Sequence, residues 1–573
     1  MKRRIMNLPL ILLAITPAYG YEVSTAIQKK KILLEEFTGI NCGNCPQGHA
    51  VAKSLTTAQK ENAYTVAIHS GSYARPAADQ PDYRTDIGEF LDTELGAYNA
   101  GYPCGTVNRH VFAGTSVITS RTTWTKNGKS IHEEDAPVNL WMESEFNGTD
   151  RTLTITVEGY YTADTEAHEN MLNVLWTQSN IQGPQNGGGV GEDYIHKHML
   201  RGYITEGWGD VIDNPRAGEY FTRTYTYTIP EELKGIGVLA EEIEVIAFVC
   251  ADEREVLNVT GSKPVYRNYE KPIGAILQTP VLEMEGRYGF NYFEARLKSE
   301  TDEPITSAGF EVMINGETQT ASWEGNIPSF QTEELRIDVN PYEIRDENGY
   351  EIRLISLNGE TVAGNRLSGT FFAPWEATPE VMISLQTDLY ADENRFCLKD
   401  RDGNIVREFG PYETDRKATY EEELSLDPDR IYCLEVTDEW GDGIQQPKGN
   451  FKIYNAGREM IGSNYNIQQH GCRGFFRTNL TSDLNTTADP GNTRINYRKD
   501  TQTIHVQLEA TTSGMAEIRI ISVTGKTIAF RKIRVNGQET IHETWPASGL
   551  TPGLYLVNIH RDGKNETLKL SIY

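Results

Sequence analysis

Apolar and polar positions follow a helical spacing in the first part of this chain and an alternating spacing afterwards. Residues 32–37 form an apolar run that two glutamates interrupt, which predicts a buried strand. From Cys45 onward, apolar residues recur at steps of three and four, which predicts a helix. The same patterns predict a strand at 64–69 and helices at 86–98 and 120–131. We therefore expect a mixed α/β unit at the start of the chain.

After residue 135 the spacing between apolar residues falls to two. Leu153, Ile155 and Val157 alternate with threonines, and Tyr225 and Tyr227 do the same, so each segment predicts a half-buried strand. A long excursion that contains three consecutive glycines separates these segments. Short apolar runs bounded by Asn-Gly turns continue beyond them. Most of the protein is therefore predicted to be β, in Ig-like or other β-sandwich domains.

Two cysteines, Cys42 and Cys45, fall where the first predicted strand passes into the first predicted helix. A C-x-x-C at such a junction is typical of thioredoxin-like redox sites. A thiol at a helix N-terminus lies beside unsatisfied N–H groups and the positive end of the helix dipole, and both favour the thiolate. We expect the pKa of Cys42 to be lowered and its sulfur to attack, with Cys45 as the resolving thiol.

Three further residues match positions that thioredoxins use. Glu36 lies six residues before Cys42, where thioredoxins carry a buried carboxylate; the alternative is a solvated residue at a strand edge. Pro103 resembles, by its place in the chain, the cis-proline that faces the C-x-x-C in thioredoxin folds. Cys104 follows it and would be a third thiol near the site; the alternative is an ordinary buried cysteine.

The first twenty residues resemble a secretory signal peptide. They begin with basic residues, continue with a short apolar run and end with small residues, so the mature chain is expected to begin at Tyr21. No later stretch approaches the roughly 20 apolar residues that span a bilayer, so we expect no transmembrane segment in the mature chain. The pattern predicts an exported protein.

Length and charge narrow the class of protein. A chain of 573 residues is expected to form several domains. The net charge of −27 is spread along the chain, and binding to nucleic acid needs a basic face. We therefore expect no nucleic-acid partner.

Seven cysteines are too few for a scaffold held together by disulfides. Cys250 lies on an apolar strand and is predicted to be a core residue. Three others fall in one later module, where two of them could form a bridge: Cys397, Cys433 and Cys472. His196 and His198 would share a face on a strand and could bind a metal ion, but no third ligand is near in sequence. A structural pair of histidines is the alternative.

Several separated motifs resemble one known family. They are Glu35-Glu-Phe-Thr-Gly39, the C-x-x-C-P, Gly101-Tyr-Pro103, Asn108-Arg109, Tyr194-Ile-His-Lys-His-Met-Leu-Arg201 and Gly207-Trp-Gly209. Together they resemble the outer-membrane-protein-28 family of Bacteroidota over about residues 25–267. The resemblance implies export, a surface or outer-membrane location and a thioredoxin-like N-terminal half. It leaves the biochemical activity undefined.

A later β-module carries the turn Asp438-Glu-Trp-Gly-Asp442-Gly, which resembles a module recurring in secreted Bacteroidota proteins. Asp438 and Asp442 could bind a hard cation such as calcium through their carboxylates. The spaced ligands and terminal glutamate of an EF-hand are missing. A purely structural Asx-Gly turn is the alternative, and the sequence favours it; no other cofactor is predicted.

The end of the chain resembles the C-terminal sorting domain of type IX secretion cargo. The matching residues are those of Leu-x-x-Gly-x-Tyr, with Gly553 and Tyr555, and of a terminal Lys-x-x-Ile that begins at Lys569. The resemblance implies that the type IX secretion machinery is a partner, that the domain is cleaved, and that the remainder is attached to the cell surface. An ordinary terminal Ig-like domain is the alternative.

These patterns predict a multidomain protein with one α/β thioredoxin-like domain followed by several all-β domains. The predicted ranges are 1–20 for the signal peptide, 21–135 for the thioredoxin-like domain, 136–272 for a β-sandwich-like domain, 273–385 for an Ig- or fibronectin-like domain, 386–478 for the module with the Asp-x-x-Gly-Asp-Gly turn, 479–494 for a linker and 495–573 for the sorting domain.

Two functions remain open from the sequence. The several β-modules beside one small redox-like unit favour a surface binding or adhesin-type scaffold, with a protein or host-surface ligand. The alternative is a secreted thiol–disulfide oxidoreductase that uses Cys42 and Cys45. Asn44 replaces the proline of thioredoxin's C-G-P-C and Asn41 replaces its tryptophan, and redox poise cannot be read from spacing alone.

Overall fold

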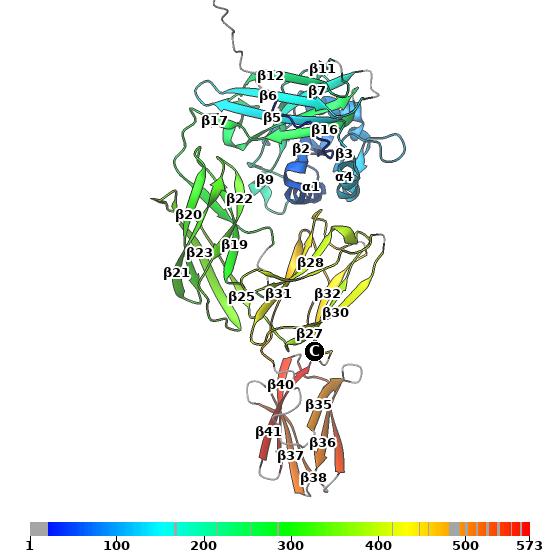
Figure 1. The fold of residues 1–573 in the computed structure, drawn as a ribbon, viewed down its shortest axis with the longest axis vertical. Coiled ribbons are helices and arrows are strands. Elements are labelled where there is room, and N and C mark those ends of the chain that lie inside the picture. Colours follow the sequence, from blue (N-terminus) through cyan, green and yellow to red (C-terminus); the bar gives the residue numbers. More distant parts are fainter. Residues whose placement is uncertain are drawn as a thin grey trace, which may run out of the picture. The chain divides into compact units, whose positions relative to one another are not determined.

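A computed structural model describes residues 21–480 and 493–572, apart from short gaps at 166–168, 214, 253, 283–285, 415, 446, 457, 499–501, 511–513, 523–525, 536–538, 552 and 562–563. The predicted signal peptide and most of the predicted linker lie outside the described residues. The chain forms two compact units, residues 1–479 and 480–573. Each unit is mostly β, and the helices gather near the start of the first one (Figure 1).

A mixed sheet organises the first part of unit one. Its strand order is β16 (Glu255–Ser262), β15 (Ile243–Ala251), β7 (Asn170–Gln178), β10 (Met199–Tyr203), β2 (Ala63–His69), β1 (Ile32–Thr38), β3 (Cys104–Val107) and β4 (Thr119–Ser120), with β11 (Asp210–Ile212) also paired to β7. Strands β1 and β2 are parallel, and β3 runs antiparallel to β1. The helices of this part are α1 (Cys45–Gln59), α2 (Gly71–Ala74), α3 (Asp86–Leu95) and α4 (Trp124–His132).

Alternation along β1 places helices on both faces of that sheet. Ile32 and Leu34 pack in one core with residues of α1 and α4. Leu33 and Phe37 point the other way and pack in a core with residues of α3 and of β15. Each strand residue is buried because both faces are covered, which explains why the run reads as continuously apolar in the sequence.

A second sheet packs against the first one. It contains β12 (Tyr220–Thr228), β6 (Thr152–Tyr161), β5 (Val138–Asn147) and β17 (Val265–Arg267). Its inward-facing residues share a core with the face of β15 that carries Val245, Ala247 and Val249. Two small hairpins lie in the same part of the chain: β8 (Ile181–Gly183) with β9 (Tyr194–His196), and β13 (Glu232–Leu233) with β14 (Ile236–Gly237).

The predicted ranges 21–135 and 136–272 share one sheet in the structure. Strand β10 from the second range pairs in parallel with β2 from the first, and the backbone N–H of Ala67 donates to the carbonyl oxygen of His198 at 2.8 Å. The spacing of apolar residues changes near residue 135 because the second sheet begins there. Residues before and after this point share a core on one face of the first sheet. Sequence periodicity reports on local structure and carries no information on which strands pair.

Two further sandwiches complete unit one. The first joins β18 (Ala275–Gln278), β19 (Tyr292–Ser299) and β22 (Thr332–Asp338) to a sheet of β21 (Glu317–Ile327), β20 (Ile305–Ile314), β23 (Glu347–Leu357), β24 (Glu360–Thr361) and β25 (Arg366–Phe372). The second joins β26 (Trp375–Glu376), β34 (Gly471–Arg477), β31 (Ile431–Asp438), β28 (Asn394–Asp400) and β29 (Ile405–Phe409) to β30 (Thr419–Ser425), β27 (Glu380–Gln386), β32 (Asn450–Asn455) and β33 (Met460–Asn464). Strands β26 and β27 thus belong to the second sandwich, although they precede its predicted start at residue 386.

The bridge that the sequence left open among the three later cysteines does not form. Cys397, Cys433 and Cys472 are all free thiols. The strand register explains this, because Cys397 lies opposite Glu435, Cys433 opposite Lys399 and Phe475, and Cys472 opposite Val436.

Unit two consists of two sheets around a core of its own. One contains β35 (Thr493–Arg498), β36 (Thr503–Ala510) and β39 (Glu539–Pro546). The other contains β38 (Thr527–Val535), β37 (Gly514–Ser522), β40 (Gly553–Arg561) and β41 (Lys564–Ile572). Across the described residues of both units, none of the helices is long and apolar enough to cross a membrane.

Candidate functional site

The two cysteines of the C-x-x-C lie between the end of β1 and the start of α1, and they form a disulfide. The sulfur–sulfur distance is 2.12 Å, and α1 begins at Cys45 itself. The backbone N–H of Cys42 donates to the carbonyl oxygen of Gly39, which closes the turn. Both cysteines are buried: Cys42 is 2% exposed and Cys45 is 0% exposed. A redox disulfide has to be reached by a partner thiolate, so this burial is the property that decides what the site can do.

A segment from far along the chain covers the turn that carries the disulfide. The side-chain amide of Gln185 donates to the carbonyl oxygens of Cys42 at 3.0 Å and Gly39 at 3.2 Å. The backbone N–H of Asn186 donates to the carbonyl oxygen of Ile40 at 2.8 Å. We call residues 184–189 the cover segment. It belongs to the glycine-rich excursion noted in the sequence.

Gly187 shows how closely the cover segment approaches the turn. A Cβ added at Gly187 would lie 2.0 Å from the carbonyl oxygen of Gly43, which no real side chain can tolerate. Its φ of +78° also lies in the region that favours glycine. The run of three glycines suggests a flexible segment in the sequence. At one of these positions, however, a close backbone contact requires glycine.

Pro103 follows a cis peptide bond and packs against the first turns of α1. The bond between Tyr102 and Pro103 is cis. A Cβ added at Gly48 would lie 2.9 Å from the Cβ of Pro103, so the proline ring touches the helix backbone one turn after Cys45. The expected cis-proline is thus present beside the helix that begins at the disulfide.

Cys104 is a buried free thiol on β3, where it pairs with Phe37 of β1. Its side chain lies in the core that α3 covers, and its thiol donates to the carbonyl oxygen of Ala97 at 3.8 Å. Burial, with Asp92 and Glu36 nearby, raises the pKa of Cys104 to about 12. At neutral pH it is therefore a protonated core residue rather than a nucleophile.

Glu36 is a fully buried carboxyl group, not a solvated residue at a strand edge. It is 1% exposed, and its Oε1 has no hydrogen-bond partner. Burial raises the pKa of Glu36 well above its usual range, which favours the protonated form. An ionisable neighbour is His49 of α1, whose Nε2 lies 3.8 Å from Oε1.

His49 connects Glu36 to the region beside the cover segment. Its ring nitrogens form hydrogen bonds with the hydroxyl of Thr38 at 2.9 Å and the hydroxyl of Tyr194 at 2.6 Å. Burial, with a smaller effect of His196, lowers the pKa of His49 to about 4. His49 is therefore neutral near pH 7, and burial favours the neutral form of Glu36 beside it as well.

His196 and His198 do not share a strand face, so they do not form the pair of metal ligands that the sequence left open beside the favoured structural alternative. Strand β9 ends at His196, and His198 has a φ of +50°. His196 is buried against the rings of His69 and Tyr83, whereas His198 is half-buried and pairs with Glu244 at 3.3 Å. The turn between the two residues breaks the alternation on which the prediction depended.

Two other residues of the family motifs form a buried ion pair. Arg109 donates to both carboxylate oxygens of Glu35, at 2.6 Å and 2.8 Å, and both side chains are fully buried. The guanidinium lies over the rings of Trp208 and Phe248. These motif residues hold the sheet together and lie on the face of β1 opposite α1.

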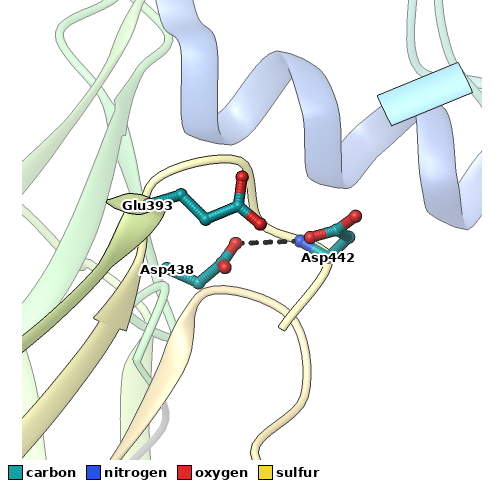
Figure 2. A group of neighbouring side chains, drawn as sticks. All are labelled: Glu393, Asp438 and Asp442. Carbon is teal, nitrogen blue, oxygen red and sulfur yellow. Dashed lines mark hydrogen bonds between the residues drawn. The ribbon is translucent and has the colours of Figure 1, made fainter. Parts of the chain in front are cut away.

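The structure also brings Asp438 and Asp442 together, and it adds Glu393 to them (Figure 2). The sequence did not indicate Glu393, which lies 45 residues before Asp438. The sequence also gave no sign that the C-x-x-C turn and α1 would meet three other residues: Gln185, His49 and Tyr194. Only the Gly187–Gly189 run drew attention to the excursion that supplies Gln185.

The residues of the sorting motif occupy the last two strands of unit two. Gly553 begins β40, and Tyr555 is buried in the core, where its hydroxyl donates to the carbonyl oxygen of Thr551 at 2.9 Å. Lys569 is exposed on β41 opposite Leu556. The tyrosine is therefore a packing residue, while the lysine is free to meet a partner.

Two regions of the chain match known protein families. Residues 95–267 match the family described as outer membrane protein Omp28, and residues 498–573 match the secretion system C-terminal sorting domain. The chain is a secreted protein of the outer membrane or cell surface. It carries an Omp28 region and a type IX sorting domain, which confirms the resemblance seen in the motifs. The Omp28 match begins after the C-x-x-C.

Solved structures give weaker similarities. HBP35 of Porphyromonas gingivalis is 20% identical, with a TM-score of 0.35 over 61% of this chain and 99% of that one. A domain of the outer membrane lipoprotein Omp28 from P. gingivalis is 22% identical, with a TM-score of 0.17 over 23% of this chain and 91% of that one. SGBP-B of Bacteroides ovatus is 10% identical, with a TM-score of 0.14 over 72% and 89%. No curated protein matches the chain. Similarities this weak do not define a function.

Proposed function

We propose that this protein is a surface binding scaffold, delivered by type IX secretion, whose C-x-x-C forms a permanent structural disulfide. The observation that carries the proposal is the burial of Cys42, which is 2% exposed beneath the cover segment. Thiol–disulfide exchange requires in-line attack of a thiolate on one of the sulfurs. A disulfide closed off by hydrogen bonds and by the contact at Gly187 offers no such approach.

The N-terminal part of the proposal is a thioredoxin-like fold that has lost its access to substrate. The parallel pair β1 and β2 joined by α1, the antiparallel β3 after a cis-proline, and the helices on both faces of β1 support it. In this view the fold positions the β-sandwiches, and the ligand, a protein or a host-surface molecule, binds elsewhere on the unit.

Two observations favour the alternative, a secreted thiol–disulfide oxidoreductase. Glu36 is buried beside α1 and its pKa is raised, which suits a group that exchanges a proton with the second cysteine. Pro103 is cis and touches Gly48 of the same helix. For this function the cover segment would have to move away before any exchange with substrate.

An insulin-reduction assay on the full chain separates the two functions. The full chain is needed because β10 and β7 share the sheet of β1, so residues 21–135 alone lack part of their core. We expect wild type to show no turnover above a Cys42→Ser variant. Turnover that Cys42→Ser abolishes would contradict the scaffold and establish the oxidoreductase. Thiol trapping of the secreted protein provides a second readout, and we expect Cys42 and Cys45 to remain fully oxidised.

A further inference from the structure

Three carboxylates meet at the end of the second sandwich, away from the disulfide. Glu393 precedes β28 directly, Asp438 ends β31 and Asp442 lies in the following turn. Strands β28 and β31 are paired, with Asn394 opposite Asp438, so the pairing brings Glu393 beside Asp438. One oxygen from each carboxylate lies within 4.8 Å of the other two, and Figure 2 shows the three groups converging.

Negative charge in this cluster exceeds the positive charge available to it. Glu393 is 6% exposed and Asp438 is 5% exposed. Among the described residues, the cation that pairs with the cluster is Lys129 of α4, which contacts Glu393 at 3.2 Å and is shared with Asp392 at 3.1 Å. No ion pair with Asp438 or Asp442 occurs within that same set of residues. One ammonium group is therefore divided among several carboxylates.

Asp438 has one carboxylate oxygen that is left without a partner. Its Oδ1 accepts the backbone N–H of Asp442 at 3.0 Å, but its Oδ2 is buried and has no hydrogen-bond partner. A buried carboxylate is costly unless it is paired, hydrogen-bonded or bound to a metal ion. An oxygen that is enclosed, unpartnered and part of a carboxylate facing two others is the arrangement expected of a cation ligand.

Electrostatics in the absence of a cation point in the same direction. Burial and the neighbouring Asp442 raise the pKa of Asp438 to about 7, and burial with Asp438 raises the pKa of Glu393 to about 8. Burial is the largest cause of both shifts, and repulsion between the neighbouring carboxyl groups adds to it. A bound divalent cation would remove that repulsion.

We propose that Glu393, Asp438 and Asp442 bind a divalent cation of the calcium type. All three donors are carboxylate oxygens, which suit a hard cation, whereas zinc sites are built mainly from nitrogen and sulfur ligands. Their separation can be bridged by an ion with ligand distances of about 2.3–2.6 Å. A cavity of about 250 Å³, lined by Glu393, Trp440 and Asp442 among others, leaves room for the water ligands that calcium also takes.

The cation would rigidify a turn that contacts the helical part of unit one. The hydroxyl of Ser54 in α1 donates to the carbonyl oxygen of Gly441, and the amide of Gln59 donates to that of Glu439 at 2.9 Å. Trp440 packs in the core that contains Leu55. Binding is therefore expected to stabilise these contacts between the turn and α1, independently of whether the disulfide is redox-active.

Terbium luminescence tests the site, because Trp440 lies between two of the three ligands in sequence and can transfer excitation to a bound Tb³⁺ ion. We expect the full chain to give a tryptophan-sensitised signal that saturates near one equivalent and is displaced by calcium. Asp438→Asn should reduce terbium affinity at least tenfold. Asp427→Asn, which changes an exposed residue of the same sandwich, should leave it unchanged.

The choice of asparagine at position 438 separates cation binding from a structural turn. Asparagine retains an oxygen that can accept the N–H of Asp442, so a structural role alone predicts unchanged terbium binding, and that result would overturn the proposal. A wild-type chain that gives no sensitised signal would overturn it as well. Glu393→Gln is the second variant, expected to weaken binding too. Calcium should raise the melting temperature of wild type but not of Asp438→Asn, with both folded by circular dichroism.

Discussion

Gln185 donates its side-chain amide to the carbonyl oxygen of Cys42 across a separation of 143 residues, at a distance of 3.0 Å. This hydrogen bond joins the cover segment to the turn that carries the disulfide. The same amide also donates to the carbonyl oxygen of Gly39. The two hydrogen bonds hold the cover segment over the turn, so they limit the access of a thiol to the disulfide.

Replacing Gln185 by alanine should expose the disulfide. The change removes two hydrogen bonds to the turn, each worth about 0.5–1.5 kcal/mol, so the cover segment should open about 10-fold more often. We expect dithiothreitol to reduce the Cys42–Cys45 bond in native Gln185→Ala about 10-fold faster than in wild type, as measured by alkylation and mass spectrometry. Gln182→Ala is the control, since Gln182 is exposed and bonds to Asp193 instead. Equal reduction rates in all three proteins would show that the cover segment does not limit access.

Replacing Gly187 by alanine should displace the cover segment, whereas Gly189→Ala should not. Both glycines have a positive φ, +78° and +76°, so both variants carry the same type of backbone strain, about 1 kcal/mol. Only at position 187 would the new Cβ meet an atom, the carbonyl oxygen of Gly43. We expect faster reduction of the disulfide in Gly187→Ala alone. A similar change in both variants would mean that strain, and not the contact, determines access.

Replacing Arg109 by methionine should destabilise the sheet around β1 severely. The change leaves Glu35 buried and unpaired, which costs about 3–5 kcal/mol. Cys104 and Cys250 are free thiols in the adjoining core, so their alkylation rate reports local unfolding. We expect a rise of at least 100-fold in that rate for Arg109→Met. Arg267→Met removes the exposed pair with Glu145 and should change the rate by less than about threefold. A small effect at Arg109 would mean that the buried pair contributes little to the stability of this sheet.

Replacing Glu36 by glutamine should stabilise the protein increasingly as the pH rises. The pKa of Glu36 is raised in the folded state, so the folded chain retains a proton that the unfolded chain has already lost. Wild type therefore loses stability as the pH increases from about 4.5 toward the folded pKa, and glutamine does not. We expect the melting temperature of Glu36→Gln minus that of wild type to grow between pH 5 and pH 8, as measured by scanning calorimetry.

His49 contributes a pH dependence of the opposite sign. Its pKa is lowered to about 4, so its contribution to stability rises with pH between about 4 and 6.5. Because both variants retain His49, its effect largely cancels in the difference between them. Glu61→Gln, which also replaces a glutamate by glutamine but at an exposed position, is the control and should leave the melting temperature close to that of wild type. A flat difference for Glu36→Gln would mean that Glu36 ionises normally.

Much of the local structure could be predicted from residue order. The disulfide between Cys42 and Cys45 and the elements on either side of it follow from short-range patterns, where the spacing of side chains constrains geometry directly. The cis-proline at Pro103 was expected from the likeness to thioredoxin folds, by its place in the chain. The burial of Glu36 was one of two alternatives that the sequence left open.

The residues that decide access and charge came from tertiary contacts. Gln185 reaches Cys42 only because β10 joins the sheet beside β2, and Glu393 reaches Asp438 only because β28 pairs with β31. His196 and His198 separate because the chain turns between them. Strand pairing between distant segments depends on the total burial of apolar surface, to which no single stretch of sequence is sensitive. For this reason the C-x-x-C between a predicted strand and a predicted helix located the disulfide in the sequence. Only the folded chain showed that another segment covers it.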